Sequence, residues 1–321
     1  MTGWEQVLTL LGSPLMQRAL LAAVLVGAAA PVVGTFLVQR RMALMGDGIG
    51  HVALTGVAVG WLVGSWAAAS PADALAVPGA VVAAVVGSVV IEVVRERGRT
   101  SGDLALAIMF YGGIAGGVLL IKVAGGTNAN LMGYLFGSIS TVSTPDLWWT
   151  AGLAVLVLTV GVGLRWALFT VSHDEEFARA SGLPVRVLSM LVATLAALTV
   201  TIAMRVVGLL LVSALMIVPV AVAQVVARSF GRTMALASAT GVAVSVAGLL
   251  VTYWNDVPPG ATIVVLAIAV YAATAALHPL LARRRTEHDP HPDLSDDVLV
   301  PATDPRCDDD APAAPAGPPT R

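Results

Sequence analysis

The stretch Met42-Ala-Leu-Met-Gly-Asp47-Gly-Ile-Gly-His51-Val-Ala-Leu-Thr-Gly-Val-Ala-Val-Gly-Trp61 is an apolar run long enough to cross a membrane as a helix. Asp47 and His51 interrupt it, and their spacing of four residues puts both side chains on one helix face, one turn apart. A charge in hydrocarbon costs about 2.5–3.5 kcal/mol even on lenient insertion scales, so such residues usually face a cavity, a partner or a substrate path. A carboxylate oxygen and an imidazole nitrogen on one face supply half of a site for a divalent transition metal.

The composition requires a membrane environment. Hydrophobic residues make up 57% of the 321 positions and charged residues only 12%, against about 25% charged in a soluble domain. The 32 glycines fit helices that pack closely through small residues. The single cysteine, Cys307, excludes a disulfide framework and a thiolate metal cage.

The net charge of −2 is distributed unevenly. Residues 1–285 carry a net charge of +5, whereas residues 286–321 carry −7 and are rich in proline and alanine. Such a segment cannot bury enough apolar surface to fold. The sequence therefore predicts an N-terminal segment over 1–14, a transmembrane body over 15–282 and a disordered acidic tail over 283–321.

The pattern of apolar runs predicts an all-α integral membrane protein with eight or nine transmembrane helices, since a span needs about 20 apolar residues. The region 187–227 is ambiguous, because it reads either as two full spans or as one span followed by a short broken helix. The predicted spans are 15–39, 42–66, 74–94, 103–124, 146–168, 187–204, 206–227, 233–254 and 259–281.

Basic residues predict the orientation, because cytoplasmic loops carry an excess of arginine and lysine. Every second connection is basic, at 40–41, 95–99, 165–186, 228–232 and 283–285. The alternate connections, 67–73, 125–145 and 255–258, are poor in basic residues and are predicted to face outward. This pattern places the C-terminal tail in the cytoplasm, and the N-terminus outside if there are nine spans.

Two cytoplasmic connections have features of short helices. In the segment 172–184, Ser172 or Asp174 can cap a helix with acidic residues in its first turn, and Gly182 with Pro184 ends it. The segment 219–232 has an apolar face and basic residues at its end. Such helices either dock a cytosolic partner or serve as connectors only.

Several ordered motifs together resemble the membrane subunits of zinc, manganese and iron uptake ABC importers. The stretch from Arg40 to Gly56 is similar to their second-helix signature, which reads roughly RRM-S-L-x-GDA-x-SH. The resemblance covers residues 15 to about 282. The other matching stretches are Tyr134-Leu-Phe-Gly-Ser138 with Asp146-Leu-Trp148, Asp174-Glu-Glu-Phe-Ala-Arg-Ala-Ser-Gly-Leu-Pro184, Arg205-Val-Val-Gly-Leu-Leu-Leu-Val-Ser-Ala-Leu-Met-Ile-Val-Pro219 and Asp256-Val-Pro-Pro-Gly-Ala-Thr-Ile263.

Ala43, Gly48 and Gly50 depart from the family pattern, where serine, alanine and serine are frequent. The loss of a serine hydroxyl beside His51 removes one hydrogen bond that could tune a metal-binding imidazole. This departure bears on metal preference.

The resemblance implies a homodimeric type II ABC permease of the vitamin and metal-chelate importer kind, in the plasma membrane. It implies a second copy of the chain, a cytosolic ATPase dimer, an extracytoplasmic metal-binding protein and lipid as partners, with no nucleic acid. ATP belongs to the partner, since this chain has no G-x-x-x-x-G-K-[ST] loop and is predicted not to be an enzyme. No cofactor is bound permanently, and the cargo is Zn²⁺, Mn²⁺ or Fe²⁺.

The resemblance also assigns roles to residues. Asp47 and His51 are the predicted metal ligands, doubled across a dimer axis. The residues themselves, apart from the resemblance, make Asp256 a candidate gate or outer docking residue and predict that Arg40 and Arg41 anchor the cytoplasmic face, with Glu92 a solvated helix end. The segment 219–232 is expected to be the main ATPase contact. The predicted ATPase-coupling residues are Asp174, Glu175, Glu176, Phe177, Arg179, Gly182, Gln224, Arg228, Phe230 and Arg232.

Two alternatives remain open from the residues. A secondary carrier or channel without an ATPase would use Asp47 and His51 as a proton or cation relay. A siderophore or corrinoid permease would keep the ATPase but would need a wide, uncharged path, with no use for the Asp–His pair.

Overall fold

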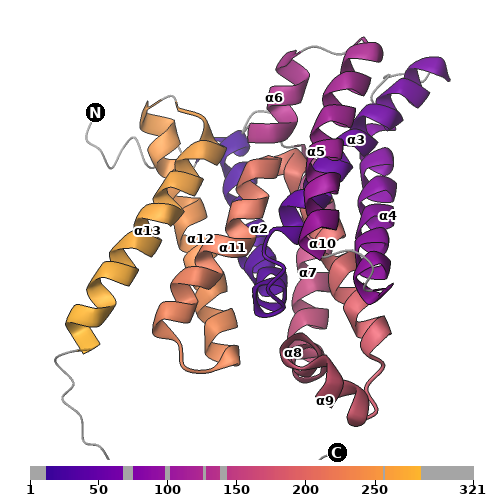
Figure 1. The fold of residues 1–321 in the computed structure, drawn as a ribbon. Coiled ribbons are helices and arrows are strands. Elements are labelled where there is room, and N and C mark those ends of the chain that lie inside the picture. Colours follow the sequence, from indigo (N-terminus) through magenta and orange to yellow (C-terminus); the bar gives the residue numbers. More distant parts are fainter. Residues whose placement is uncertain are drawn as a thin grey trace, which may run out of the picture. The chain divides into compact units, whose positions relative to one another are not determined.

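The computed structural model describes residues 12–67, 75–97, 102–125, 128–137, 143–255 and 257–282, and their regular secondary structure is entirely helical (Figure 1). The helices are α2 (Pro14–Gln39), α3 (Met45–Trp66), α4 (Ala76–Arg97), α5 (Gly102–Val123), α6 (Asn128–Phe136), α7 (Thr144–Gly163), α8 (Arg165–His173), α9 (Glu175–Ala180), α10 (Val185–Val207), α11 (Leu209–Val226), α12 (Phe230–Asn255) and α13 (Pro259–Ala282).

Within these ranges nine helices are long and apolar enough to cross a membrane, namely α2, α3, α4, α5, α7, α10, α11, α12 and α13. The all-α membrane fold predicted from the sequence is confirmed. In the ambiguous region α10 and α11 are two separate helices. They part at Gly208, whose φ of 88° suits glycine, and Pro219 lies inside α11 without ending it.

Two short helices, α6 and α8, were not predicted from the sequence. No helix was expected in 125–145, where α6 forms. The span predicted over 146–168 ends earlier, at Gly163, and α8 begins at Arg165. The guanidinium of Arg165 lies 5.2 Å from the ring centroid of Trp166, a pair typical of a membrane boundary, so the chain leaves the span there.

The prediction of a short helix over 219–232 is wrong. Residues up to Val226 continue α11, Ala227 is extended, and α12 already begins at Phe230. The reason is compositional, since 219–226 is apolar apart from Gln224 and therefore stays in the span.

Small residues hold α3 tightly between α4 and α5. Gly56 and Gly60, one turn apart, face the backbone of α4 around Gly79, as in a G-x-x-x-G contact. On the other side, a Cβ added to Gly113 of α5 would lie 2.6 Å from the carbonyl carbon of His51. Close backbone approach on both sides therefore fixes the helix that carries Asp47 and His51.

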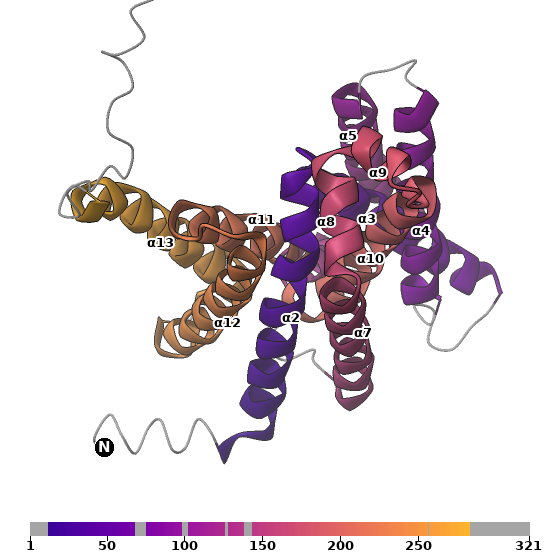
Figure 2. The same cartoon turned by 90° about the horizontal axis from the view of Figure 1, so that it is seen from below.

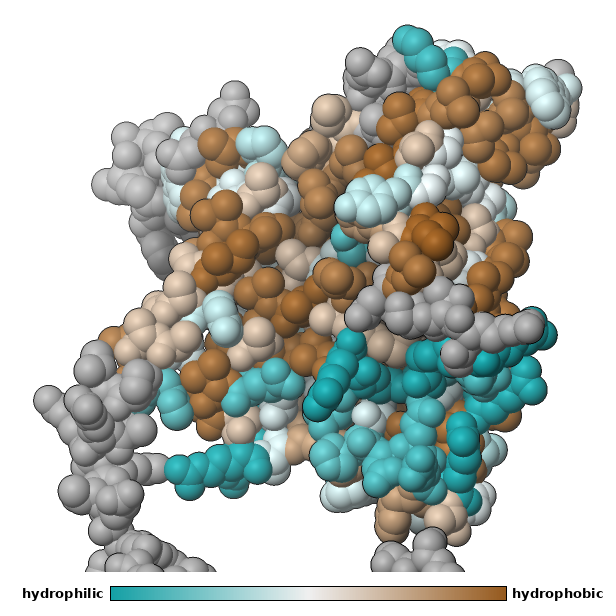
Figure 3. Space-filling model, in the orientation of Figure 1, coloured by the Kyte–Doolittle hydropathy of each residue, from teal (hydrophilic) through white to brown (hydrophobic). Residues whose placement is uncertain are grey.

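Helix α10 links this group to the rest of the body. It packs against α2, α3, α4, α7 and α11, while α2 also packs against α11 and α12 (Figure 2). Helices α8 and α9 lie together at the lower end in Figure 1, called here the α8–α9 end, and hydrophilic side chains gather over them in Figure 3.

Candidate functional site

Asp47 lies in the first turn of α3, where the helix dipole favours a carboxylate, and His51 follows one turn later. The distance between His51 Nε2 and Asp47 Oδ1 is 3.7 Å, and the side chains are 7% and 22% exposed. This separation is too long for a direct hydrogen bond. It fits two ligands of one ion, since ligand distances of about 2.0–2.2 Å place both atoms within reach of the same metal. The two residues predicted from the sequence are therefore brought together.

The imidazole of His51 is fixed from one side by α5. Its ring meets Phe110 edge-on, with ring centroids 4.6 Å apart and planes at 79°. Thr55 donates a hydrogen bond of 2.8 Å to the Gly113 carbonyl and so ties α3 to α5 beside the ring. His51 Nδ1 is buried and has no hydrogen-bond partner among the described residues, in keeping with glycine at position 50.

The pair lies deep in the body. His51 rests against Gly113, halfway along α5, and Gly46 faces the side chain of Met216, halfway along α11. Among the described residues no group of three or more histidine, cysteine, aspartate or glutamate side chains could hold an ion. Within the described residues the Asp47–His51 pair could offer two ligands, and a divalent transition metal needs at least two more.

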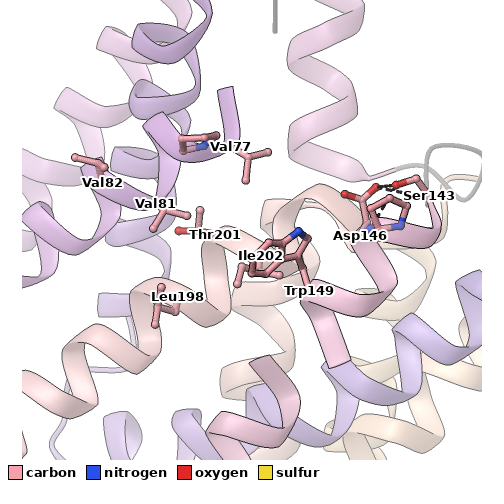
Figure 4. A pocket seen from close by; sticks show the side chains of 11 residues that line it. Val77, Val81, Val82, Ser143, Asp146, Trp149, Leu198, Thr201 and Ile202 are labelled. Carbon is pink, nitrogen blue, oxygen red and sulfur yellow. Dashed lines mark hydrogen bonds between the residues drawn. The ribbon is translucent and has the colours of Figure 1, made fainter. Parts of the chain in front are cut away.

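A mostly apolar cavity of about 730 Å³ lies between α4, α7 and α10, apart from the Asp47–His51 pair (Figure 4). Its carboxylate, Asp146, accepts hydrogen bonds from the Ser143 backbone N–H at 3.2 Å and from the Ser143 hydroxyl at 2.5 Å. The two residues form a capping box that starts α7. Asp146 therefore serves to cap the helix, and this cavity lacks the ligand chemistry of the Asp47–His51 pair.

The segment 174–182 forms the short helix predicted from the sequence. Asp174 accepts a 2.9 Å hydrogen bond from the Phe177 N–H, and Gly182, at φ 79°, ends the helix. Phe177 is 62% exposed and the Arg179 side chain is 66% exposed. Glu176 is also exposed. The helix therefore presents an apolar and charged surface at the α8–α9 end.

Glu175, the first residue of α9, faces inward. It accepts hydrogen bonds of 2.9 Å from Arg40 and 2.5 Å from Arg95. Burial alone would raise the pKa of Glu175, but the hydrogen bonds and charges of Arg95 and Arg40 outweigh it, so the pKa lies below its ordinary value.

The expectation of a solvated Glu92 is wrong. Its side chain is fully buried and bonds Arg95 at 2.8 Å, with Arg40 at 3.8 Å. Arg40 is also buried, at 4%, so it is an internal ion-pair partner as well as a residue of a helix end. The only sequence signal for this cluster was an i, i+3 acid–base pair at the end of an apolar run.

The remaining predicted ATPase-coupling residues differ in exposure. Gln224, Arg228 and Arg232 are exposed at the end of α11 and the start of α12. Phe230 instead packs partly inside, with ring centroids 5.5 Å from Phe36 and 4.7 Å from Phe169. Asp256 lies outside the described residues, as do residues 283–321.

Comparison with known proteins agrees with this architecture. A family model described as the ABC 3 transport family matches residues 13–278. The manganese transport system membrane protein MntC of Halalkalibacterium halodurans is 34% identical over 270 residues, which cover 84% of this chain and 89% of that protein.

Two solved structures share the fold. One is PsaBC from Streptococcus pneumoniae in complex with Fab, at TM-score 0.74 and 31% identity over 84% of this chain and 94% of that one. The other, an inward-facing putative metal-chelate type ABC transporter, has TM-score 0.62 at 18% identity, over 88% and 91% of the two chains, and supports the fold alone. The chain therefore belongs to the ABC 3 transport family and is a multi-pass membrane permease of an ABC transporter.

Proposed function

We propose that this chain is the permease subunit of an ATP-driven importer that moves Mn²⁺ into the cytoplasm. The observation that carries the proposal is the Asp47–His51 pair, with its oxygen and nitrogen 3.7 Å apart in the middle of a membrane permease. One carboxylate and one imidazole without a thiolate suit Mn²⁺, and Zn²⁺ and Fe²⁺ accept the same ligands. The name of the MntC relative favours manganese among the three.

A second copy of the chain completes the ligand set in this proposal. Two subunits around a central axis contribute two carboxylates and two imidazoles, which is enough for a transient four-ligand site. Transient binding suits transport, because an ion held too tightly would not be released. An extracytoplasmic binding protein delivers the ion from the outer side, and Asp256 is a candidate docking or gating residue.

The α8–α9 end faces the cytoplasm in this proposal and contacts the ATPase dimer. The basic connections at this end support the orientation. Helix α9, with exposed Phe177 and Arg179, is the main contact, and the link between α11 and α12, with Arg228 and Arg232, is the second. We favour α9 because it is a separate helix, whereas 219–226 belongs to a span.

Transport then proceeds by alternating access. The ion enters from the binding protein, and Asp47 and His51 replace part of its hydration shell. Closure of the ATPase dimer moves α9 and the α11–α12 link, the spans rearrange, and the ion leaves toward the cytoplasm.

The proposal is tested by elemental analysis of cells that lack this chain, complemented with wild type or with Asp47→Ala. Selective loss of manganese, restored by wild type alone, is the expected result. Loss of zinc or iron instead would change the cargo. Unchanged content of all three metals would favour a siderophore or corrinoid permease. Failure of any ATPase to copurify with the tagged permease would count against the proposed contact at the α8–α9 end.

A further inference from the structure

Charged side chains from three helices meet at the α8–α9 end, and a fourth helix adds a hydroxyl. Arg40 is the C-cap of α2, Glu92 and Arg95 lie in the last turns of α4, Glu175 begins α9, and Ser189 belongs to α10. Glu175 Oε1 lies 2.9 Å from Arg40 Nη2 and 2.5 Å from Arg95 Nη2. Glu92 Oε1 lies 2.8 Å from Arg95 Nη2, and Arg40 also donates to the Ser189 hydroxyl. These residues are called here the α9 network.

The α9 network is buried at its centre and is not saturated. The side chains of Arg40 and Glu92 are 4% and 0% exposed, so each depends on the other members to offset its desolvation. Glu92 Oε2 and Arg95 Nε are buried atoms without a hydrogen-bond partner among the described residues. A buried cluster with a spare donor and a spare acceptor can change its pairing without exposing a charge. Such a cluster is suited to an element that has two arrangements.

Glu175 supplies the ion pairs between α9 and the helices α2 and α4. The body of α9 packs mainly on α8 and α10, and of its six residues only Ala178 is buried. Glu175 therefore provides the direct ion-pair link from α9 to Arg40 and Arg95, beside the packing of α8 and α10 and the 3.0 Å hydrogen bond between Gln39 and His173.

Arg40 is connected to the metal site by a short, hydrogen-bonded turn. The Arg41 N–H bonds the Val38 carbonyl and the Met42 N–H bonds the Leu37 carbonyl, which closes the end of α2 with Arg41 at φ 59°. The Met45 N–H bonds the Met42 carbonyl, and α3 begins there. Asp47 thus follows Arg40 by seven residues of ordered backbone.

We propose that Arg40 is a positioning residue that couples α9 to the metal site. Glu175 pulls on Arg40 when the ATPase moves α9, and the turn after Arg40 carries that displacement to Asp47 and His51. The carboxylate of Glu92, 3.8 Å from Arg40, keeps a negative charge beside the buried guanidinium of Arg40 throughout. This inference rests on the proposed function, because it takes α9 as the ATPase contact and the pair as the ion site.

The test uses the complex of permease and ATPase in proteoliposomes, with Mn²⁺ as cargo. The Glu175→Gln variant removes the charge that joins α9 to Arg40, at a side chain that is 29% exposed and so less demanding for folding. Manganese moved per ATP hydrolysed should fall on the order of tenfold, the size of an ordinary coupling between sites, while ATP hydrolysis and assembly persist. Glu175→Asp, which keeps the charge, should recover part of the loss.

A matched control is Arg186→Gln. Arg186 pairs with Glu96 at 3.3 Å, between α10 and α4 at the same end, but this exposed pair does not involve α9 or Arg40. Its removal should leave manganese per ATP unchanged. An equal loss in both variants would make the α9 network an ordinary structural ion pair and overturn the inference.

A distance measurement separates coupling from stability. Spin labels replace Leu44, which is exposed in the α2–α3 turn, and Ser181, which is exposed at the end of α9, with Cys307 replaced by serine. In wild type, ATP should leave the distance between these labels nearly constant, because the α2–α3 turn moves together with α9. In Glu175→Gln, ATP should change this distance. A large ATP-driven change in wild type would contradict the coupling.

Different results would overturn the proposed manganese import and the proposed coupling role of Arg40. Absence of manganese transport by the wild-type complex would remove the proposed function. Wild-type transport with unchanged manganese per ATP in Glu175→Gln, or loss of the ATPase from that variant, would remove only the coupling role.

Discussion

Asp47 and His51 are the proposed metal ligands, and neighbouring residues fix the position of the His51 side chain. Phe110 holds the imidazole edge-on, and Gly113 lets α5 approach the His51 backbone. The position of the proposed ligands therefore depends on an apolar ring and on the absence of a side chain at Gly113. We expect small changes in α5 to alter the Asp47–His51 pair.

Replacing Gly113 with alanine should destabilise the permease and impair manganese uptake. The new Cβ would lie 2.6 Å from the His51 carbonyl carbon and 2.8 Å from the Val52 nitrogen, both backbone atoms, and overpacking of this kind costs about 1–3 kcal/mol. Gly112→Ala is the matched control, since nothing lies within 4 Å of its added Cβ. Thermal unfolding in detergent and cellular uptake check both variants. Equal behaviour of the two would show that the α3–α5 contact does not constrain the site.

The ion pairs of Glu175 should make stability depend on acid pH. Its pKa is lowered in the folded chain, since its bonds to Arg95 and Arg40 outweigh burial, so its contribution is present above the unfolded value of about 4.3. That contribution disappears as the pH falls through the folded value. Wild type should therefore lose more thermal stability than Glu175→Gln between neutral pH and about pH 3. Parallel pH profiles of the two proteins would contradict this.

At the scale of elements, α9 depends on its ends. A helix of six residues is too short to be stable alone, so the Asp174 cap, the burial of Ala178 and the turn at Gly182 must hold it. Asp174→Ala should cost about 1 kcal/mol of local stability, and Asp174→Asn should retain the cap. Faster hydrogen exchange over 175–180 and weaker copurification of an ATPase in the alanine variant alone would bear this out. Exchange that is equally fast in both variants would mean that the cap is not what holds α9.

Features with local sequence signals could be predicted, whereas features that depend on contacts between distant helices could not. Helix α9 was predictable because its start and end signals are local, at Asp174 and Gly182. The expected helix over 219–232 failed because apolarity alone continues a span and does not mark a break. The burial of Glu92 could not be predicted, because it pairs with Arg40 at the end of α2, and Arg40 in turn pairs with Glu175 of α9. These helices are far apart in the sequence. Asp47 and His51 were predictable because both lie on one helix face.

At the scale of the whole molecule, the spans were recognisable from hydropathy, and the breaks at Gly208 and Leu164 required local geometry. In the proposed function a single chain provides half of the metal site, and the α8–α9 end contacts the ATPase. Both features describe a subunit that works in an assembly. The membrane permease family of this chain is consistent with such an assembly.

The proposed function requires that Mn²⁺ passes the Asp47–His51 pair, driven by ATP hydrolysis. The most direct measurement is ATP-dependent uptake of radioactive manganese into proteoliposomes that contain the permease with its copurified ATPase. Wild type should accumulate manganese, whereas Asp47→Asn and His51→Gln should not, although both variants still assemble and hydrolyse ATP. Manganese uptake by either variant at the wild-type rate would contradict the account.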